Sequence, residues 1–414
     1  MHFGIVTPPV PGHLHPFGAL GRELIARGHR ATVIHLADLE PQVLSEGLEF
    51  TAIGQTDHPH GSLPVSLAKL GQLQGLAALR FTIEAVRKTT EMICRDAPDA
   101  IRAARIDMLL VDQTEPAGGT VAEHLGLPFI TICNALMLNR EPGVPPPFTP
   151  WAAGCEWWRQ TRNRLGYAVS ARFMAPVTSV VAKYRREWNL PKHHCPEDSF
   201  SSLAQISQQI PEFDFPRVRL PETFHYAGPF RDTRIAPSSF PWDRLDPAHT
   251  LVYASLGTLQ HSKAPIFQCI AEACAGLPQV QLVLAGGETQ SRPGEPICVA
   301  WAPQAPLIQR AGLVLTHGGL NTVLDALRFG VPTVVIPIAY EQPAIAARVE
   351  WTRAGRSLPL NRLDVARLRT AIRQVLSDSA YSGQARRMAA ACERAGGAER
   401  AASLIERLAA RSCN

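Results

Sequence analysis

The stretch Leu313-Val-Leu-Thr-His-Gly-Gly-Leu-Asn-Thr322 joins a short apolar run to a turn with two glycines and then to a helical pattern. We expect a strand over residues 313–316 and a helix that begins near Asn321. The glycines let a ligand approach the backbone, and the free N–H groups and dipole at a helix start attract phosphate oxygens. The stretch therefore predicts a strand–turn–helix unit with a phosphate site at the helix N-terminus.

Polar side chains near this turn fit a larger ligand. His317 stands at the mouth of the turn as a donor suited to a diphosphate, and Asn321 or Thr322 either caps the helix or binds the ligand. Asp325 lies one helical turn beyond Asn321 and can accept two hydrogen bonds from vicinal hydroxyls. Glu341 follows the next strand and its proline turn, so we expect it at the same rim.

The alternation of strand-like runs and helical patterns extends through most of the chain. We expect further strands over residues 3–7, 31–35, 108–112, 129–133, 251–255, 281–285, 297–301 and 333–338. Such units imply parallel pairing with right-handed crossovers. The predicted fold class is α/β, with two doubly wound Rossmann-like domains that face each other across a cleft.

The length of 414 residues exceeds one ordinary domain. A proline-rich stretch near residues 228–247 is typical of a linker. We expect a first domain over residues 1–227, a linker over 228–249 and a second domain over 250–385. The remaining residues, 386–414, are predicted to form a C-terminal helix that packs back toward the first domain.

Composition places the chain among globular proteins, with 46% hydrophobic and 19% charged residues. No stretch is expected to span a bilayer, because proline, glycine or charge interrupts each apolar run. No signal peptide is expected either, because the chain starts directly as a strand. Nine cysteines without a Cys-x-x-Cys pair or a Cys/His cluster predict reduced thiols, a cytoplasmic location and no zinc site.

Segment 151–188 carries seven basic and two acidic residues together with Trp151, Trp157, Trp158 and Trp188. A basic helix that bears Trp could rest on an anionic membrane surface. The alternative, which we favour here, is a solvated helix face whose Trp residues pack into the core or line a pocket. Nucleic-acid binding is not expected, because no recognised module or sustained basic stripe is present.

The run from Trp301-Ala-Pro-Gln304 to Pro337-Ile-Ala-Tyr-Glu-Gln-Pro343 closely resembles the donor-binding signature of the UDP-glycosyltransferase superfamily, glycosyltransferase family 1, whose fold is GT-B. The donor-binding residues that this resemblance implies are Ser255, Thr258, Trp301, Ala302, Gln304, His317, Gly319, Asn321, Thr322, Asp325, Glu341 and Gln342. It implies that Trp301 stacks on uracil and that Gln304 helps to hold the nucleoside. Asp325 takes the ribose-binding position, where the family usually has Glu.

The same resemblance assigns residues to the phosphates and to the sugar of the donor. It implies that His317, Asn321 and Thr322 hold the phosphates. Glu341 and Gln342 hold the sugar hydroxyls, since an acid–Gln pair usually marks a glucose-type donor. The turn 255–258 looks like the family's phosphate-contacting turn, although Ser and Thr there could simply cap a helix.

A second motif, Pro11-Gly-His-Leu-His-Pro16, follows the first strand. A His with a near-neutral pKa can take a proton from an attacking hydroxyl. In the family the general base is the His followed three residues later by Pro, and His13 is the one that matches. Such a base needs a carboxylate to orient it. Asp112 occupies the family's partner position, and Glu115 is the rival on the same loop.

Two absences narrow the chemistry. The first loop lacks Gly-x-Gly-x-x-Gly, so a nicotinamide- or flavin-binding domain is not expected. The chain has no Asp-x-Asp for a metal bound to a sugar nucleotide. We expect the helix N-terminus and His317 to neutralise the leaving diphosphate, with no metal, no cofactor and UDP-glucose as co-substrate.

Stretches of the first predicted domain, where the family binds its acceptor, resemble one branch of the family. Residues 111–119, 122–128, 133–136 and 138–151 look like the branch of bacterial and cyanobacterial enzymes that glucosylate the xanthophyll zeaxanthin. The predicted function is inverting transfer of glucose to a hydroxyl of an apolar acceptor, most simply a xanthophyll. The alternatives are another aglycone (a flavonoid or a macrolide), a UDP-sugar epimerase-like enzyme, and a non-catalytic pigment-binding protein.

Overall fold

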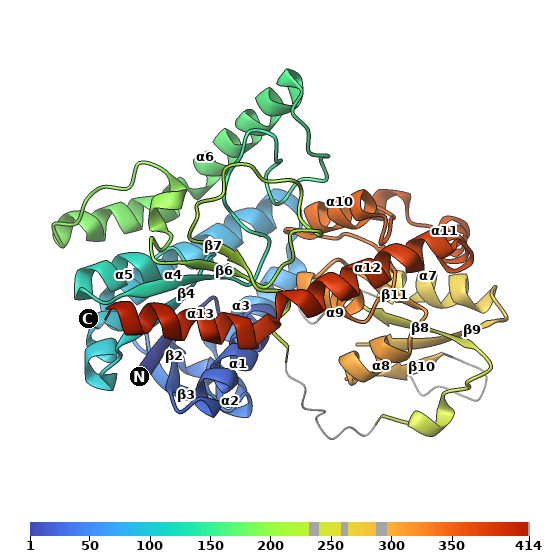
Figure 1. Cartoon of the computed structure of the whole chain (residues 1–414), viewed down its shortest axis with the longest axis horizontal. Coiled ribbons are helices and arrows are strands. Elements are labelled where there is room, and N and C mark those ends of the chain that lie inside the picture. The colour runs from blue at the N-terminus through green and yellow to red at the C-terminus, as the bar shows by residue number, and fades with distance from the viewer. Residues whose placement is uncertain (232–239, 258–263, 287–295, 413–414) are drawn as a thin grey trace.

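The computed structural model describes residues 1–231, 240–257, 264–286 and 296–412. Two α/β lobes lie side by side (Figure 1). Every strand pair in both sheets is parallel, and helices cover the sheets as parallel crossovers require. The predicted fold class, two doubly wound Rossmann-like domains, is confirmed.

The first sheet has seven strands in the order β3-β2-β1-β4-β5-β6-β7. They are β1 His2–Val6, β2 Arg30–Leu36, β3 Glu49–Ile53, β4 Met108–Asp112, β5 Phe129–Cys133, β6 Gln205–Ser207 and β7 Phe224–Tyr226. Its helices are α1 Pro11–Ala26, α2 Glu40–Ser45, α3 Ser62–Gln72, α4 Gly75–Ala104, α5 Gly118–Leu125 and α6 Trp157–Glu187. The strand order reverses between β1 and β4, where doubly wound sheets bind their ligands.

The second sheet has six strands in the order β10-β9-β8-β11-β12-β13. They are β8 Thr250–Ser255, β9 Val280–Ala285, β10 Ile297–Val299, β11 Leu313–Thr316, β12 Thr333–Val335 and β13 Gly355–Ser357. Its helices are α7 Ala264–Ala275, α8 Gln304–Arg310, α9 Leu320–Arg328, α10 Gln342–Thr352, α11 Val365–Ser377, α12 Ser379–Ala395 and α13 Gly397–Ser412. The order reverses between β8 and β11, so the turn at His317 stands at this switch point.

Two strands are shorter than the sequence predicts. β10 ends at Val299 instead of residue 301, and the chain bends at Trp301, which is exposed. β12 ends at Val335 instead of residue 338. Pro337 has no N–H to donate, and the N–H groups of Ile338 and the next residue donate to the Gln342 side chain. Those amides are therefore used to shape the turn.

The last helix returns to the first lobe (Figure 1). Ile405 and Ala401 of α13 are fully buried and share a core cluster with Phe3 and Phe17 of the first domain. The crossing is made at Gly396 and the following glycine, both with positive φ, rather than at residue 386, which lies inside α12.

A separate hydrophobic core cluster joins the two lobes. It contains Leu136, Ile210 and Phe213 from the first domain with Leu320, Val323, Ile345 and Met388, among others, from the second. Beside it, Asp214 and Arg348 form a buried ion pair, with the carboxylate 3.0 Å from Nε and 2.8 Å from Nη2. Arg217 and the hydroxyl of Tyr226 also donate to Asp214. The lobes are therefore locked by packing and by charge.

The expectation that no segment is apolar enough to span a bilayer is wrong by length and composition. Within the described part of the chain, α6 is one helix that is long and apolar enough to cross a membrane. Only 17% of its most apolar window is buried. Apart from Arg172, its charged residues lie near its two ends, which leaves the intervening run more apolar than the composition of segment 151–188 suggests.

Replacing Arg348 with Ala should lower the free energy of unfolding by about 1.5–3 kcal/mol, because a charged hydrogen-bond pair across the interface is lost while Arg217 and Tyr226 still pair with Asp214. The matched control is Arg394→Ala. Arg394 also bridges the lobes, to Glu212 at 3.2 Å, but that pair is exposed and is worth about 0–1 kcal/mol. Urea unfolding followed by circular dichroism measures both; equal losses in the two variants would contradict a buried clamp.

Candidate active site

A single cleft of about 1510 Å³ runs between the two switch points. Its walls include the start of α1, parts of α3 and α4, and the turns that follow β8, β11 and β12. The carboxyl ends of both sheets therefore face one cavity, as doubly wound folds require.

His13 lies in the first turn of α1, not on a loop, because Pro11 at the helix start presets the backbone for a helix. Its Nδ1 lies 2.8 Å from Oδ2 of Asp112, at the end of β4. Asp112 is fully buried and is fixed by Thr114, whose N–H and hydroxyl donate to Oδ1, and by Asn134, whose amide donates to Oδ2. With Nδ1 engaged, Nε2 is the ring nitrogen left to act on a ligand.

The proline of this motif also has a structural effect. In a helix the N–H of residue 16 would donate to the carbonyl of Gly12, but Pro16 has no N–H. The Gly12 carbonyl instead accepts a hydrogen bond of 2.7 Å from the side chain of Asn321 in the second domain. The motif thus ties the start of α1 to the helix that follows the glycine turn.

The charges around His13 set its protonation. Burial lowers the pKa of His13, but the charge and hydrogen bond of Asp112 outweigh burial, so the pKa is raised above 6.5. Burial raises the pKa of Asp112, yet His13 and Thr114 lower it more, and the carboxylate stays ionised. Burial raises the pKa of Glu115 to about 8, and within the described part of the chain its carboxyl accepts one hydrogen bond, from the Ala117 N–H at 3.3 Å. Asp112, not Glu115, is the partner of His13 in this structure.

The structure brings nearly all of the predicted donor residues to the same cleft. The residues that line it are Ser255, Trp301, Ala302, Gln304, His317, Gly319, Asn321, Thr322, Asp325, Glu341 and Gln342, together with His13. Asp112 lies behind His13 and does not line the cleft. Thr258 falls outside the described residues.

Asp325 is held on both of its oxygens. Arg231 donates to Oδ1 through Nε, and Gln304 donates to Oδ2 at 2.6 Å. Arg231 also reaches the carbonyl and side chain of Asn321 and the Gln208 side chain. A carboxylate oxygen can accept two hydrogen bonds, so each oxygen keeps one site for a ligand hydroxyl. Arg231 fixes the carboxylate without blocking it.

Glu341 and Gln342 have different parts in the turn after β12. Glu341 accepts from the backbone N–H of Leu136 at 3.2 Å, and burial raises its pKa. Gln342 uses its side-chain oxygen to accept from the N–H groups of Ile338 and Ala339, both at 2.8 Å. Its amide nitrogen stays available to the cleft, where Gln342 is one of the lining residues.

Some expectations fail in detail, and some residues were missed. Neither Asn321 nor Thr322 caps α9, which begins at Leu320 after Gly319 and has no side-chain cap. Asn321 is used across the cleft instead. Arg231 was assigned only to the linker and Asn134 was not singled out, because their partners are far away in sequence. No local pattern marks either residue.

Two lobes of GT-B type, with a histidine–aspartate pair facing a glycine turn across one cleft, define a glycosyltransferase. Matches to known proteins specify which kind. A family model described as UDP-glucoronosyl and UDP-glucosyl transferase matches residues 168–391. The chain belongs to this family of UDP-glycosyltransferases.

Relatives extend the match over the full length. The chain is 34% identical to the zeaxanthin glucosyltransferase of Pantoea ananas, covering 98% of this chain and 96% of that protein. It is 35% identical to the zeaxanthin glucosyltransferase of Pseudescherichia vulneris, covering 99% and 98%. The glycotransferase of kitacinnamycin has a similar structure, with a TM-score of 0.78, 24% identity and 98% coverage of both chains. At that identity the structural likeness speaks for the fold alone.

Replacing Asp112 with Asn should lower the pKa of His13, because the charge that raises it is lost while burial, which lowers it, remains. Titration of the His13 ring by NMR measures this. The control Thr114→Val removes one hydrogen bond to Asp112 but keeps its charge, so it should lower the pKa less. An unchanged pKa of His13 in the Asn variant would show that the pair does not set its protonation.

Proposed function

We propose that the protein transfers glucose from UDP-glucose to a hydroxyl of an apolar acceptor, a xanthophyll such as zeaxanthin, with inversion and without a metal or cofactor. The observation that carries the chemistry is the His13–Asp112 pair, in which a fully buried Asp112 holds the partly exposed His13 at one switch point, facing the glycine turn of the other domain. The two zeaxanthin glucosyltransferases, similar over nearly the whole chain, support the acceptor. A cytoplasmic location belongs to the same proposal.

The proposed reaction is a single displacement. Nε2 of His13 takes the proton of the acceptor hydroxyl as the oxygen attacks the anomeric carbon. The bond from that carbon to the UDP oxygen breaks, and its electron pair leaves with UDP. Asp112 holds the ring and stabilises the imidazolium that forms. Attack opposite to an α-linked leaving group gives a β-glucoside.

The second domain supplies the groups that suit the donor. Trp301 is 62% exposed beside the cleft, as a platform for uracil requires. Asp325 has one free acceptor site on each oxygen for the vicinal ribose hydroxyls. The N-terminus of α9, with His317 and Thr322, faces the place proposed for the diphosphate. Arg231, paired with Asp325, also donates to the Asn321 side chain and holds it beside the place proposed for the diphosphate.

The first domain offers an apolar wall for the acceptor. Leu63, Leu67 and Leu70 of α3 and Phe81 of α4 line the cleft on the side of His13. A long hydrocarbon with a terminal hydroxyl can bury its apolar part there while the hydroxyl reaches Nε2. Glu341, close enough to affect the charge on His13, stands between the acceptor end and the proposed sugar site.

Purified protein with UDP-glucose and detergent-dispersed zeaxanthin, in EDTA, should form zeaxanthin glucosides. Chromatography with mass spectrometry detects them, and proton NMR of the anomeric centre tests for the β configuration. A flavonoid and a macrolide are run in parallel. Product from these alone would discard the xanthophyll and keep the chemistry. An altered UDP-sugar without an acceptor would indicate an epimerase, and pigment binding without UDP binding would indicate a non-catalytic protein.

Replacing His13 with Ala should lower kcat by about 10²–10⁴-fold, the usual contribution of a general base, while the Kd for UDP measured by calorimetry changes little. His15→Ala is the matched control. His15 lies two residues along the same helix, is 61% exposed and pairs with Glu46 instead of Asp112. Loss of UDP affinity in the His13 variant, or equal loss of kcat in both variants, would contradict the role of His13 as base.

A further inference from the structure

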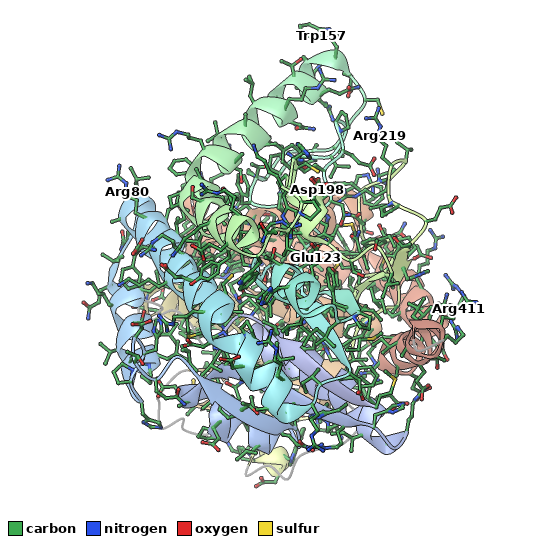
Figure 2. All side chains as sticks on the ribbon, turned by 90° about the vertical axis from the view of Figure 1, so that its left-hand side faces the viewer. Arg80, Glu123, Trp157, Asp198, Arg219 and Arg411 are labelled. Atoms are coloured by element: carbon green, nitrogen blue, oxygen red, sulfur yellow. The ribbon has the colours of Figure 1, made fainter. Side chains whose placement is uncertain are left out.

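The two halves of α6 have different surroundings. In its C-terminal half Val177, Val180 and Tyr184 are buried in a core cluster or beside it, packed with α4 and α5. The N-terminal half stands clear of the body of the molecule, with Trp157 at its far end (Figure 2). Trp157 is 79% exposed. A protruding half-helix with apolar tips is unusual for a surface that only meets water.

A stripe of apolar side chains runs along this free half. Trp158, Leu165, Val169 and Phe173 are exposed by 48%, 63%, 56% and 39%. Their spacings of seven, four and four residues put them on one face of the helix. Phe148 and Trp151 from the preceding segment join the stripe and form with it a shallow groove of about 670 Å³. We call these residues, with Trp157, the α6 face.

Arginines border the α6 face. Arg164 and Arg172 are exposed on the free half, and the Arg162 guanidinium lies 4.6 Å from the ring centre of Trp151. Arg159 lies 5.0 Å from the ring centre of Trp158. No acidic residue occurs between Glu156 and Glu187. Side-by-side Trp and Arg, with apolar side chains between them, is the composition that suits the headgroup region of a bilayer.

We propose that the α6 face rests on an anionic lipid bilayer and anchors the enzyme there as a peripheral protein. The contact lies along the surface and does not span it, because the C-terminal half of α6 is packed into the first domain. The charge argues against the simplest rival, a symmetric pair of copies joined through this face, since that would bring arginines near arginines. The proposed function supplies only the purpose of this membrane contact, which is access to an acceptor dissolved in lipid.

The sequence allows two interpretations of segment 151–188, a helix on a membrane and a helix whose Trp residues pack into the core. Each of them applies to different Trp residues of the segment. Trp188 packs on His124, with ring centres 4.0 Å apart, and on Tyr184, so the packed alternative holds there. Trp157 and Trp158 face solvent, where the membrane alternative applies. Helix α4 connects the two functions, because α6 packs on it through Lys183 and Glu91 while Phe81 of the same helix lines the cleft.

Vesicle flotation tests the proposal with phosphatidylcholine vesicles that contain or lack phosphatidylglycerol. The wild-type protein should float with the anionic vesicles and much less with the neutral ones, and salt should weaken the binding. Leu165→Ser with Val169→Ser should weaken binding to anionic vesicles at least about tenfold. Arg164→Gln with Arg172→Gln should weaken it about thirtyfold, at the usual contribution of a basic residue near a charged membrane.

Matched double variants carry the same chemical changes elsewhere. Val218→Ser with Leu360→Ser removes exposed apolar side chains, and Arg373→Gln with Arg387→Gln removes exposed charges of the second domain; both should float like the wild type. All variants should keep their activity on detergent-dispersed acceptor, which separates this test from that of the proposed function. No flotation, equal flotation with neutral vesicles, or a dimer in light scattering that the Leu165/Val169 variant abolishes would each overturn the proposal.

Discussion

The buried ion pair between Asp214 and Arg348 is the constraint from which the geometry of the cleft follows. A charge removed from water must be paired. Asp214 is paired both by Arg217 of its own lobe and by Arg348 of the other, and the fully buried Arg348 has its carboxylate partner across the interface. The apolar core around Leu136 and Ile345 surrounds this contact and fixes the distance between the sheets. With the sheets fixed in this way, the carboxyl ends of β1 and β11 face one another. The functional side chains that follow these strands are positioned by that arrangement.

The charge near His13 depends on two carboxyl groups, Asp112 and Glu115, which are both buried but differ in protonation. Asp112 receives three hydrogen bonds from Thr114 and Asn134 besides that of the imidazole, and these keep it ionised. Glu115 has one weak donor, and burial raises its pKa to about 8. At neutral pH one carboxyl is therefore charged and the other mostly neutral. Burial is common to both, so it is the hydrogen-bond donors that decide which carboxyl can stabilise an imidazolium.

Local patterns in the sequence predict local structure well in this chain. The strands at residues 108–112, 129–133 and 313–316 lie at the predicted positions, since a short apolar run needs no distant partner to be recognised. Failures come where a distant group intervenes. Asn321 does not cap α9, because the helix begins one residue earlier, and its side chain donates instead to the Gly12 carbonyl of the first domain, which Pro16 leaves without a helical donor. Arg231 could not be found, since its partner Asp325 is 94 positions away.

Asp325 shows how contacts between residues far apart in sequence can fix the position of a carboxylate. Asp has one methylene fewer than the Glu that the family resemblance leads us to expect, so it reaches less far and its carboxylate depends more on its neighbours for its position. Gln304 holds one oxygen and Arg231 the other. Arg231 belongs to the segment between the lobes and also bonds to Gln208 of the first domain. The orientation of this carboxylate therefore depends, through Arg231, on a side chain of the first domain.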